Sequence, residues 1–96
     1  MYIASGKIIL DFYNNDSIGK KKSNLTSLVK EVHQKFNVSA VEVADFDDPE
    51  RCVIGISLVA STQRSAKAAI DKVLEHIDTH AFARVVVEDT DVYAYD

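Results

Sequence analysis

The segment VSAVEVADFDDPERCVIGISLVAS, residues 38–61, decides the fold that we expect for this chain. Residues 38–46 alternate between two sets of side chains, and residues 51–61 form a nearly continuous apolar run, so each half is typical of a strand. The intervening DDPE predicts a turn, because Pro49 restricts its own backbone angle. Two strands that flank so short a turn form an antiparallel hairpin.

A helix is predicted on each side of this hairpin. The first begins near Ser17, which suits the N-cap position, with Ser23 and Asn24 as alternative starts. It ends near Asn37, a residue that can take the left-handed cap conformation. The second helix covers roughly residues 65–79. Apolar residues recur at helical spacing in both segments. These stripes are Ile18, Leu25, Leu28, Val29, Val32 and Phe36, and then Ala66, Ala69, Ile70, Val73, Leu74 and Ile77.

Strands are expected at both ends of the chain, over residues 2–13 and 82–95. The element order is therefore β-α-β-β-α-β. Two crossover connections around a central hairpin predict an α+β fold, the ferredoxin-like βαββαβ plait, with a four-stranded antiparallel sheet and two helices on one face. The length of 96 residues fits a single domain over residues 1–96.

Composition and charge narrow the class of protein. No run of about 18 apolar residues is present, and we expect neither a membrane span nor a signal peptide. The single cysteine excludes an intrachain disulfide, which fits a reducing compartment such as the cytoplasm. The net charge of −4 is unevenly spread, because residues 17–35 hold five lysines and one glutamate while residues 42–51 hold five acids and one arginine. Such polarity can orient a charged partner.

The stretch SIGKKKSN, residues 17–24, holds three consecutive lysines at the start of the first helix. Free N–H groups at a helix N-terminus attract phosphate, and lysines add positive charge there. Alternatively, this is a solvated helix start whose lysines lie over apolar neighbours. Cations at this end oppose the helix dipole, and such a broken local rule is a weak indication of function. The candidate anion or nucleic-acid contacts are Lys20, Lys21, Lys22, Lys30 and Lys35.

The stretch KFNVSAVEV, residues 35–43, resembles the YlxP-like family of small uncharacterised bacterial proteins. SIGKKKS occupies the place of that family's Ser-Leu-Lys-Glu-Lys-Arg stretch, and DFDDPERCVIGISLVAS that of its aspartate-containing turn and apolar strand. Gly19 and the lysine run depart from the family pattern, and the tryptophan frequent in the turn is missing. The resemblance implies a ferredoxin-like fold and an association with translation, because the family's genes commonly lie beside those of ribosome and initiation factors. It implies no molecular activity.

No catalytic group, metal site or cofactor is predicted. His76 and His80 are four residues apart and share a helix face, which is zinc-ligand spacing, but no third ligand stands at motif spacing. His33 flanks the first stripe and is expected to be a half-buried structural residue. Cys52 follows an acidic segment that would raise its pKa, so we interpret it as a small buried hydrophobe.

Acidic residues of the hairpin have two interpretations. Those at its tip could bind a divalent cation, but the spacing lacks the glycine and terminal glutamate of an EF-hand loop, which favours a solubilising turn. Glu42 shares a strand face with apolar residues and needs a partner, for which Lys7 and Arg84 are candidates. The tip residues are Asp45, Asp47, Asp48 and Glu50.

The leading hypothesis for function is a non-enzymatic cytoplasmic protein that contacts the ribosome or structured RNA through its basic first helix. Base stacking is disfavoured, because the first and third strands lack the aromatic pattern of RNA-recognition sheets.

The alternative is a homo-oligomeric interaction module, without a nucleic-acid role, that uses the open face of the sheet. If Phe46 faces the helices, the alternate valines face outward and can form a homodimer interface. These predicted interface residues are Val41, Val43, Val53 and Val59, and Ile3, Ile9, Val85 and Val87 are expected on the same face.

Overall fold

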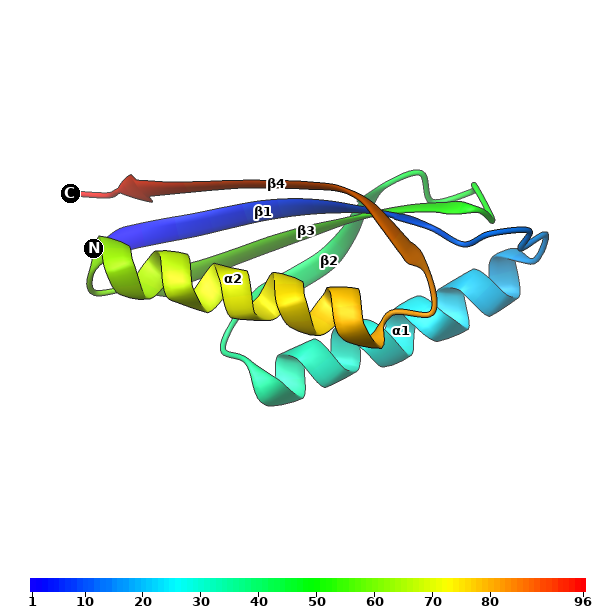
Figure 1. The fold of residues 1–96 in the computed structure, drawn as a ribbon, viewed down its shortest axis with the longest axis horizontal. Helices are drawn as coiled ribbons and strands as arrows, with labels where there is room; N and C mark the ends of the chain where they lie inside the picture. Colours follow the sequence, from blue (N-terminus) through cyan, green and yellow to red (C-terminus); the bar gives the residue numbers. More distant parts are fainter.

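The computed structural model describes residues 1–96, and its elements follow the predicted β-α-β-β-α-β order (Figure 1). The sheet is antiparallel throughout, with strand order β2-β3-β1-β4. Both helices lie on the same side of this sheet, as the topology requires. The elements are β1 (Tyr2–Asp11), α1 (Ile18–Lys35), β2 (Ser39–Ala44), β3 (Arg51–Ala60), α2 (Gln63–His80) and β4 (Arg84–Ala94).

The core lies between the sheet and the helices. Helix α2 packs on β1, β3 and β4, whereas α1 packs on β2 and against α2. The two central strands present every second side chain to the helices, as the period of two predicts. The opposite face of the sheet carries no helix (Figure 1). The buried apolar residues include Ala4, Ile8 and Leu10 of β1, Cys52, Ile54, Ile56 and Leu58 of β3, Leu25, Leu28 and Val32 of α1, and Ala66, Ile70, Val73, Leu74 and Ile77 of α2.

The helix starts follow capping chemistry. Ser17 is the N-cap of α1, and its hydroxyl oxygen accepts a hydrogen bond from the Lys20 N–H at 3.2 Å, as predicted. Helix α2 begins earlier than predicted, because Thr62 and Ser65 form a reciprocal capping box before its first turn. Neither of the two helices combines the length and apolar character that a membrane span requires.

The end of α1 differs from the prediction. Phe36 caps the helix in an extended conformation, with φ of −128°. Left-handed backbone outside glycine occurs only at Asn14 and Asp45, so the left-handed cap expected at Asn37 is wrong. Asn14 and Asp45 lie in the loop before α1 and in the turn after β2, where short polar side chains tolerate this conformation.

Two β-bulges change which side chains face the helices. The register of β2 against β3 gains one residue between Glu42 and Ala44, and that of β4 against β1 shifts next to Ile9. Phe46 therefore lies exposed in the turn, and the prediction that it faces the helices is wrong. Val85 was expected on the open face but packs against the core, so that placement is also wrong.

Candidate functional site

Lys21, the middle residue of the lysine run, is fully buried. Its ammonium nitrogen donates to the carbonyl oxygens of Asp45 at 2.6 Å and Asp48 at 2.7 Å, with a longer contact of 3.5 Å to that of Phe46. A carboxylate oxygen of Glu42 lies 3.1 Å away. Lys21 thus fastens the start of α1 to the β2–β3 turn. It is not available to phosphate, which corrects its assignment to the anion-binding group.

The partner of Glu42 is therefore Lys21, and the suggested partners Lys7 and Arg84 are wrong. The carboxylate oxygen of Glu42 that faces Lys21 is buried and lies at ion-pair distance but outside hydrogen-bond geometry. The buried Cys52 lies nearby: burial and, next, the Glu42 charge raise the pKa of its thiol to about 12, with Lys21 acting in the opposite direction. A thiol with this pKa stays protonated and is a poor nucleophile.

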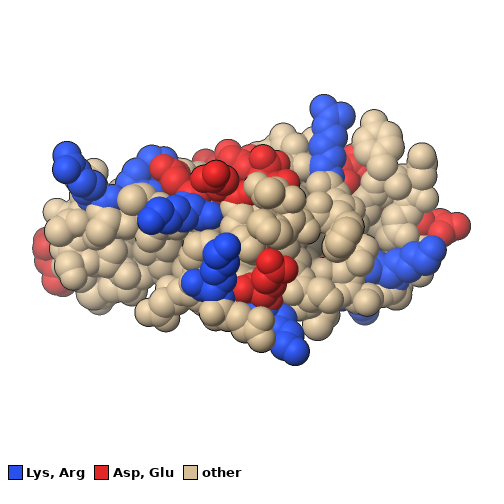
Figure 2. Space-filling view, turned by 60° about the horizontal axis from the view of Figure 1, so that its bottom comes forward, with Lys and Arg blue, Asp and Glu red and all other residues tan.

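The other four candidate lysines, Lys20, Lys22, Lys30 and Lys35, are exposed. On the face of the molecule in Figure 2, several Lys and Arg side chains lie near one another toward one end, and the others are scattered, with acidic side chains among them. That face carries no continuous basic surface of the kind that tracks a phosphate backbone.

An apolar row crosses the open face of the sheet. Ile9 of β1 is in register with Val53 of β3 on one side and with Val87 of β4 on the other, so the three side chains share a face. Val43, at the bulge of β2, continues the row. A Cβ atom at position 55 would lie only 2.9 Å from the Val43 Cγ1 atom. Because Gly55 has no side chain, Val43 can pack directly over it.

Three of the four predicted interface valines are exposed. The exposed fractions are 54% for Val41, 46% for Val43 and 64% for Val59. Val53 is only 6% exposed, because it lies in the middle of the row between neighbouring strands. Val53 therefore packs beneath its exposed neighbours and offers little area to a partner. This corrects its assignment as an interface residue.

Polar residues divide this face. Lys7 of β1 is in register with Gly55 of β3 and Asp89 of β4, which places a cation beside an anion near the middle of the sheet. Further along β1, Ile3 is in register with Val59 and Tyr93, which makes a second apolar row. The open face thus has apolar rows at two levels and a charged level between them.

A groove of about 580 Å³ runs between α1 and the edge strand β2, with Leu25, Val29 and Val41 among its lining residues. His33, exposed rather than half-buried as predicted, lines it too. The His33 Nε2 atom accepts a hydrogen bond from the Ala40 N–H at 3.2 Å. The His33 side chain therefore satisfies the Ala40 N–H of the edge strand β2, which could otherwise pair with a strand of another chain.

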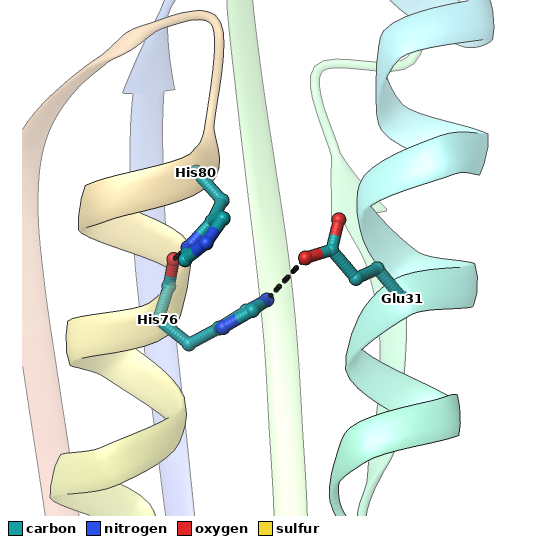
Figure 3. A group of neighbouring side chains, drawn as sticks. All are labelled: Glu31, His76 and His80. Atoms are coloured by element: carbon teal, nitrogen blue, oxygen red, sulfur yellow. Dashed lines mark hydrogen bonds and ion pairs between the residues drawn. The ribbon is translucent and has the colours of Figure 1, made fainter.

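Glu31, His76 and His80 meet where α1 and the end of α2 come together (Figure 3). The His76 Nε2 atom lies 3.0 Å from a Glu31 carboxylate oxygen, and the His80 Nδ1 atom lies 2.9 Å from the His76 carbonyl oxygen. The two imidazoles are stacked with centroids 4.0 Å apart, and Phe36 meets His76 edge-on at 5.5 Å. One potential ligand atom from each of Glu31, His76 and His80 lies within 4.8 Å of the other two.

The environment of His76 favours its neutral form. Burial, and next the neighbouring His80, lower the pKa of His76 below its ordinary value, while the Glu31 carboxylate opposes this shift. Although His76 Nε2 and the Glu31 oxygen are at ion-pair distance, the contact does not have the geometry of a hydrogen bond, which leaves that buried nitrogen without a hydrogen-bond partner.

Residues 3–90 match a family described as a protein of unknown function, DUF503. The chain belongs to the DUF503 family. It is also 31% identical over 67 residues to the uncharacterised protein YlxP of Bacillus subtilis (strain 168), a match that covers 70% of this chain and 73% of that protein. These matches confirm the YlxP-like resemblance, and neither description assigns an activity.

Solved structures confirm the ferredoxin-like fold. A de novo designed protein with a ferredoxin fold has a TM-score of 0.54 at 17% identity, covering 99% of this chain and 87% of its own. A dimeric ferredoxin-like protein from an uncultured marine organism has a TM-score of 0.50 at 13% identity, and the match covers 100% of this chain and 99% of that protein. A putative antibiotic biosynthesis monooxygenase from Nitrosomonas europaea has a TM-score of 0.50 at 16% sequence identity. This match covers 97% of this chain and 89% of that protein. At these identities the likeness concerns the fold alone.

The third member of the Glu31–His76–His80 cluster was not predicted from the sequence. The spacing of His76 and His80 indicates their shared face, but no further ligand stands at motif spacing. Glu31 comes from the other helix, and only the packing of α1 against α2 brings it there.

Proposed function

We propose that this DUF503 protein is a non-catalytic interaction module that pairs with a second copy of itself through the open face of its sheet. The observation that carries the proposal is the apolar row that crosses all four strands on the face without helices, in which Val43 and Val87 are exposed and Ile9 and Val53 lie between them. Exposed apolar residues grouped on one face mark a candidate interaction surface.

The available surface suits a weak dimer. Val41, Val43 and Val59 are half-exposed or more, and the exposed Val87 and Tyr93 add apolar area on the same face. A standard interface takes about 800 Å² per partner, roughly one seventh of the 5923 Å² that this chain exposes.

Charge favours the face over the edge of the sheet. Two copies paired along β4 would bring Glu88, Asp89 and Asp91 close to their own counterparts, which is unfavourable. On the open face Lys7 lies next to Asp89, so two copies related by a two-fold axis can place opposite charges against each other. The ferredoxin-like protein from the uncultured marine organism is described as dimeric, which supports the use of this fold in dimers.

Sedimentation across a wide range of protein concentration tests the proposal. We expect the wild-type chain to shift from monomer to dimer in the range of tens of micromolar, which corresponds to about 6 kcal/mol of association free energy. Val41→Lys places a charge on the exposed apolar face and should keep the chain monomeric with its fold intact.

Ala68→Lys is the matched control, because it adds the same charge to an exposed position of α2. It should leave the dimer unchanged. A wild-type chain that stays monomeric at the highest concentrations, or equal dimerisation of Val41→Lys, would contradict the proposed interface.

Contact with the ribosome or structured RNA through α1 stays a prediction. It now depends on Lys20, Lys22, Lys30 and Lys35, because Lys21 is buried. Replacing Lys20 and Lys22 with alanine should weaken such binding and lower the slope of log affinity against log salt by about 2. No binding to ribosomal subunits at low salt would argue against this contact.

A further inference from the structure

We propose that Glu31, His76 and His80 form a binding site for a divalent transition-metal ion of the zinc class (Figure 3). The site lies between the helices, so this inference is independent of the proposed dimer on the opposite face. The donor set is two imidazoles and one carboxylate, a combination that binds zinc at sites that keep a fourth position for water.

The distances suit this ion once the His80 ring turns out of its stack on His76, so that both imidazole lone pairs can point at one ion. Bonds of about 2.0–2.2 Å in a tetrahedral zinc site hold the ligand atoms about 3.4 Å apart. The His76 nitrogen and the Glu31 oxygen are 3.0 Å apart, and the three ligand atoms lie within 4.8 Å of one another. Glu31 and His80 are exposed, so their side chains can adjust around the buried His76.

The hydrogen bonding prepares the nitrogen atoms for a metal. When His80 donates its Nδ1–H to the His76 carbonyl oxygen, at 2.9 Å, the lone pair of its Nε2 atom is free. Metal-binding histidines commonly donate their other ring N–H to a backbone carbonyl in this way. His76 contributes a buried Nε2 atom that has no hydrogen bond of acceptable geometry, and a metal ion would provide its missing partner.

Packing holds the central ligand in place. His76 lies between the edge contact of Phe36 and the stacked ring of His80, so its imidazole is oriented before any ion arrives. The nitrogen ligands favour zinc and its neighbours in the transition series over magnesium and calcium, which prefer all-oxygen sites. An ion here would link α1 to α2.

Titration of the tag-free, metal-free chain with Zn²⁺ tests the site. We expect Zn²⁺ to raise the thermal unfolding midpoint, because an ion that binds only the folded chain stabilises it. Co²⁺ should give the visible absorption of a four-coordinate site. His80→Gln and Glu31→Gln, both at exposed positions, should each weaken Zn²⁺ binding by at least about tenfold.

His33→Gln provides the matched control, because His33 is an exposed histidine of α1 outside the cluster. It should leave Zn²⁺ affinity unchanged, and Mg²⁺ should not shift the midpoint. The proposal is wrong if Zn²⁺ leaves the midpoint of the wild-type chain unchanged. It is equally wrong if His33→Gln weakens binding as much as His80→Gln does, since binding would then be unspecific.

Discussion

Two polar clusters hold helix α1, and they differ at their central nitrogen atom. That nitrogen has several hydrogen-bond partners in the first cluster and none in the second. Each cluster also contains a carboxylate at ion-pair distance from the nitrogen. At the start of α1, the ammonium of Lys21 meets three carbonyl oxygens and the carboxylate of Glu42. Further along the same helix, Glu31 faces His76, whose buried nitrogen has no hydrogen bond of acceptable geometry. We call these the Lys21 cluster, comprising Lys21, Glu42 and the carbonyls of the turn, and the histidine cluster, comprising Glu31, His76 and His80.

The difference separates a structural role from a binding role. A buried charge is tolerated when enough partners surround it, and the Lys21 cluster supplies those partners from the turn that it fastens. The three N–H groups of the Lys21 ammonium already have acceptors and are not available to a ligand. The histidine cluster brings one possible ligand atom from each of two imidazoles and a carboxylate within 4.8 Å of one another, and two of its residues, Glu31 and His80, are exposed. Loss of the central residue should therefore lower stability strongly in the Lys21 cluster and only slightly in the histidine cluster.

The largest effect is expected from Lys21→Met. This change keeps an unbranched side chain but leaves the turn carbonyls and Glu42 without their cation, so the free energy of unfolding should fall by about 3 to 5 kcal/mol. Urea denaturation measures it. Lys22→Met, the adjacent exposed lysine, should change stability by less than about 0.5 kcal/mol. Equal effects of the two substitutions would show that Lys21 is not the anchor.

The rate at which the Cys52 thiol is labelled should report the loss of stability in Lys21→Met. The thiol is buried in the wild-type chain and its pKa is raised to about 12, so alkylation has to wait for opening of the structure. If Lys21→Met lowers stability by about 3 kcal/mol, the labelling rate should rise about a hundredfold. Because the chain has one cysteine, mass spectrometry gives this rate directly. An unchanged rate would mean that the Lys21 cluster does not control opening around Cys52.

Periodicity predicted most of the fold, because each element carries its own local signal. The hairpin, both helices and the cap at Ser17 follow from spacing and turn chemistry. The bulges were not predictable in this way, since an added residue in β2 depends on pairing with β3. Phe46 was misplaced for that reason.

Two features of the sequence together indicate the inward orientation of Lys21. Lys21 lies four residues before Leu25 and therefore on the buried face of α1. Glu42, on an apolar strand face, needed a cation from elsewhere. Combined, the two observations identify the pair, whereas the histidine cluster depends on how one helix packs against the other and has no comparable signal in the sequence.

A smaller effect is expected from pH at the histidine cluster. The pKa of His76 is lowered from 6.5 in the folded chain, so between that folded pKa and 6.5 the unfolded chain binds more protons. Stability of the metal-free chain should therefore fall as pH drops below 6.5, and level off below the folded pKa. For one proton the slope is at most about 1.4 kcal/mol per pH unit.

The groups that face this ring set the size of the effect. His80 and Lys35 add to the lowering of the pKa, and Glu31 opposes it. Urea denaturation at several pH values should show a shallower slope in His76→Phe than in the wild-type chain. If both chains lose stability in parallel over this range, other groups account for the pH dependence.

The smallest change in stability is expected from His76→Phe itself, at neutral pH without metal. The substitution keeps an aromatic ring between Phe36 and His80 and removes a buried nitrogen that has no hydrogen bond of acceptable geometry. Replacing such a group with an apolar one is close to neutral, so the free energy of unfolding should change by less than about 1 kcal/mol. The same variant should lose the stabilisation by Zn²⁺. A loss as large as that of Lys21→Met would mean that the contact between His76 and Glu31 is a structural anchor like the Lys21 cluster, and the contrast between the two ends of α1 would disappear.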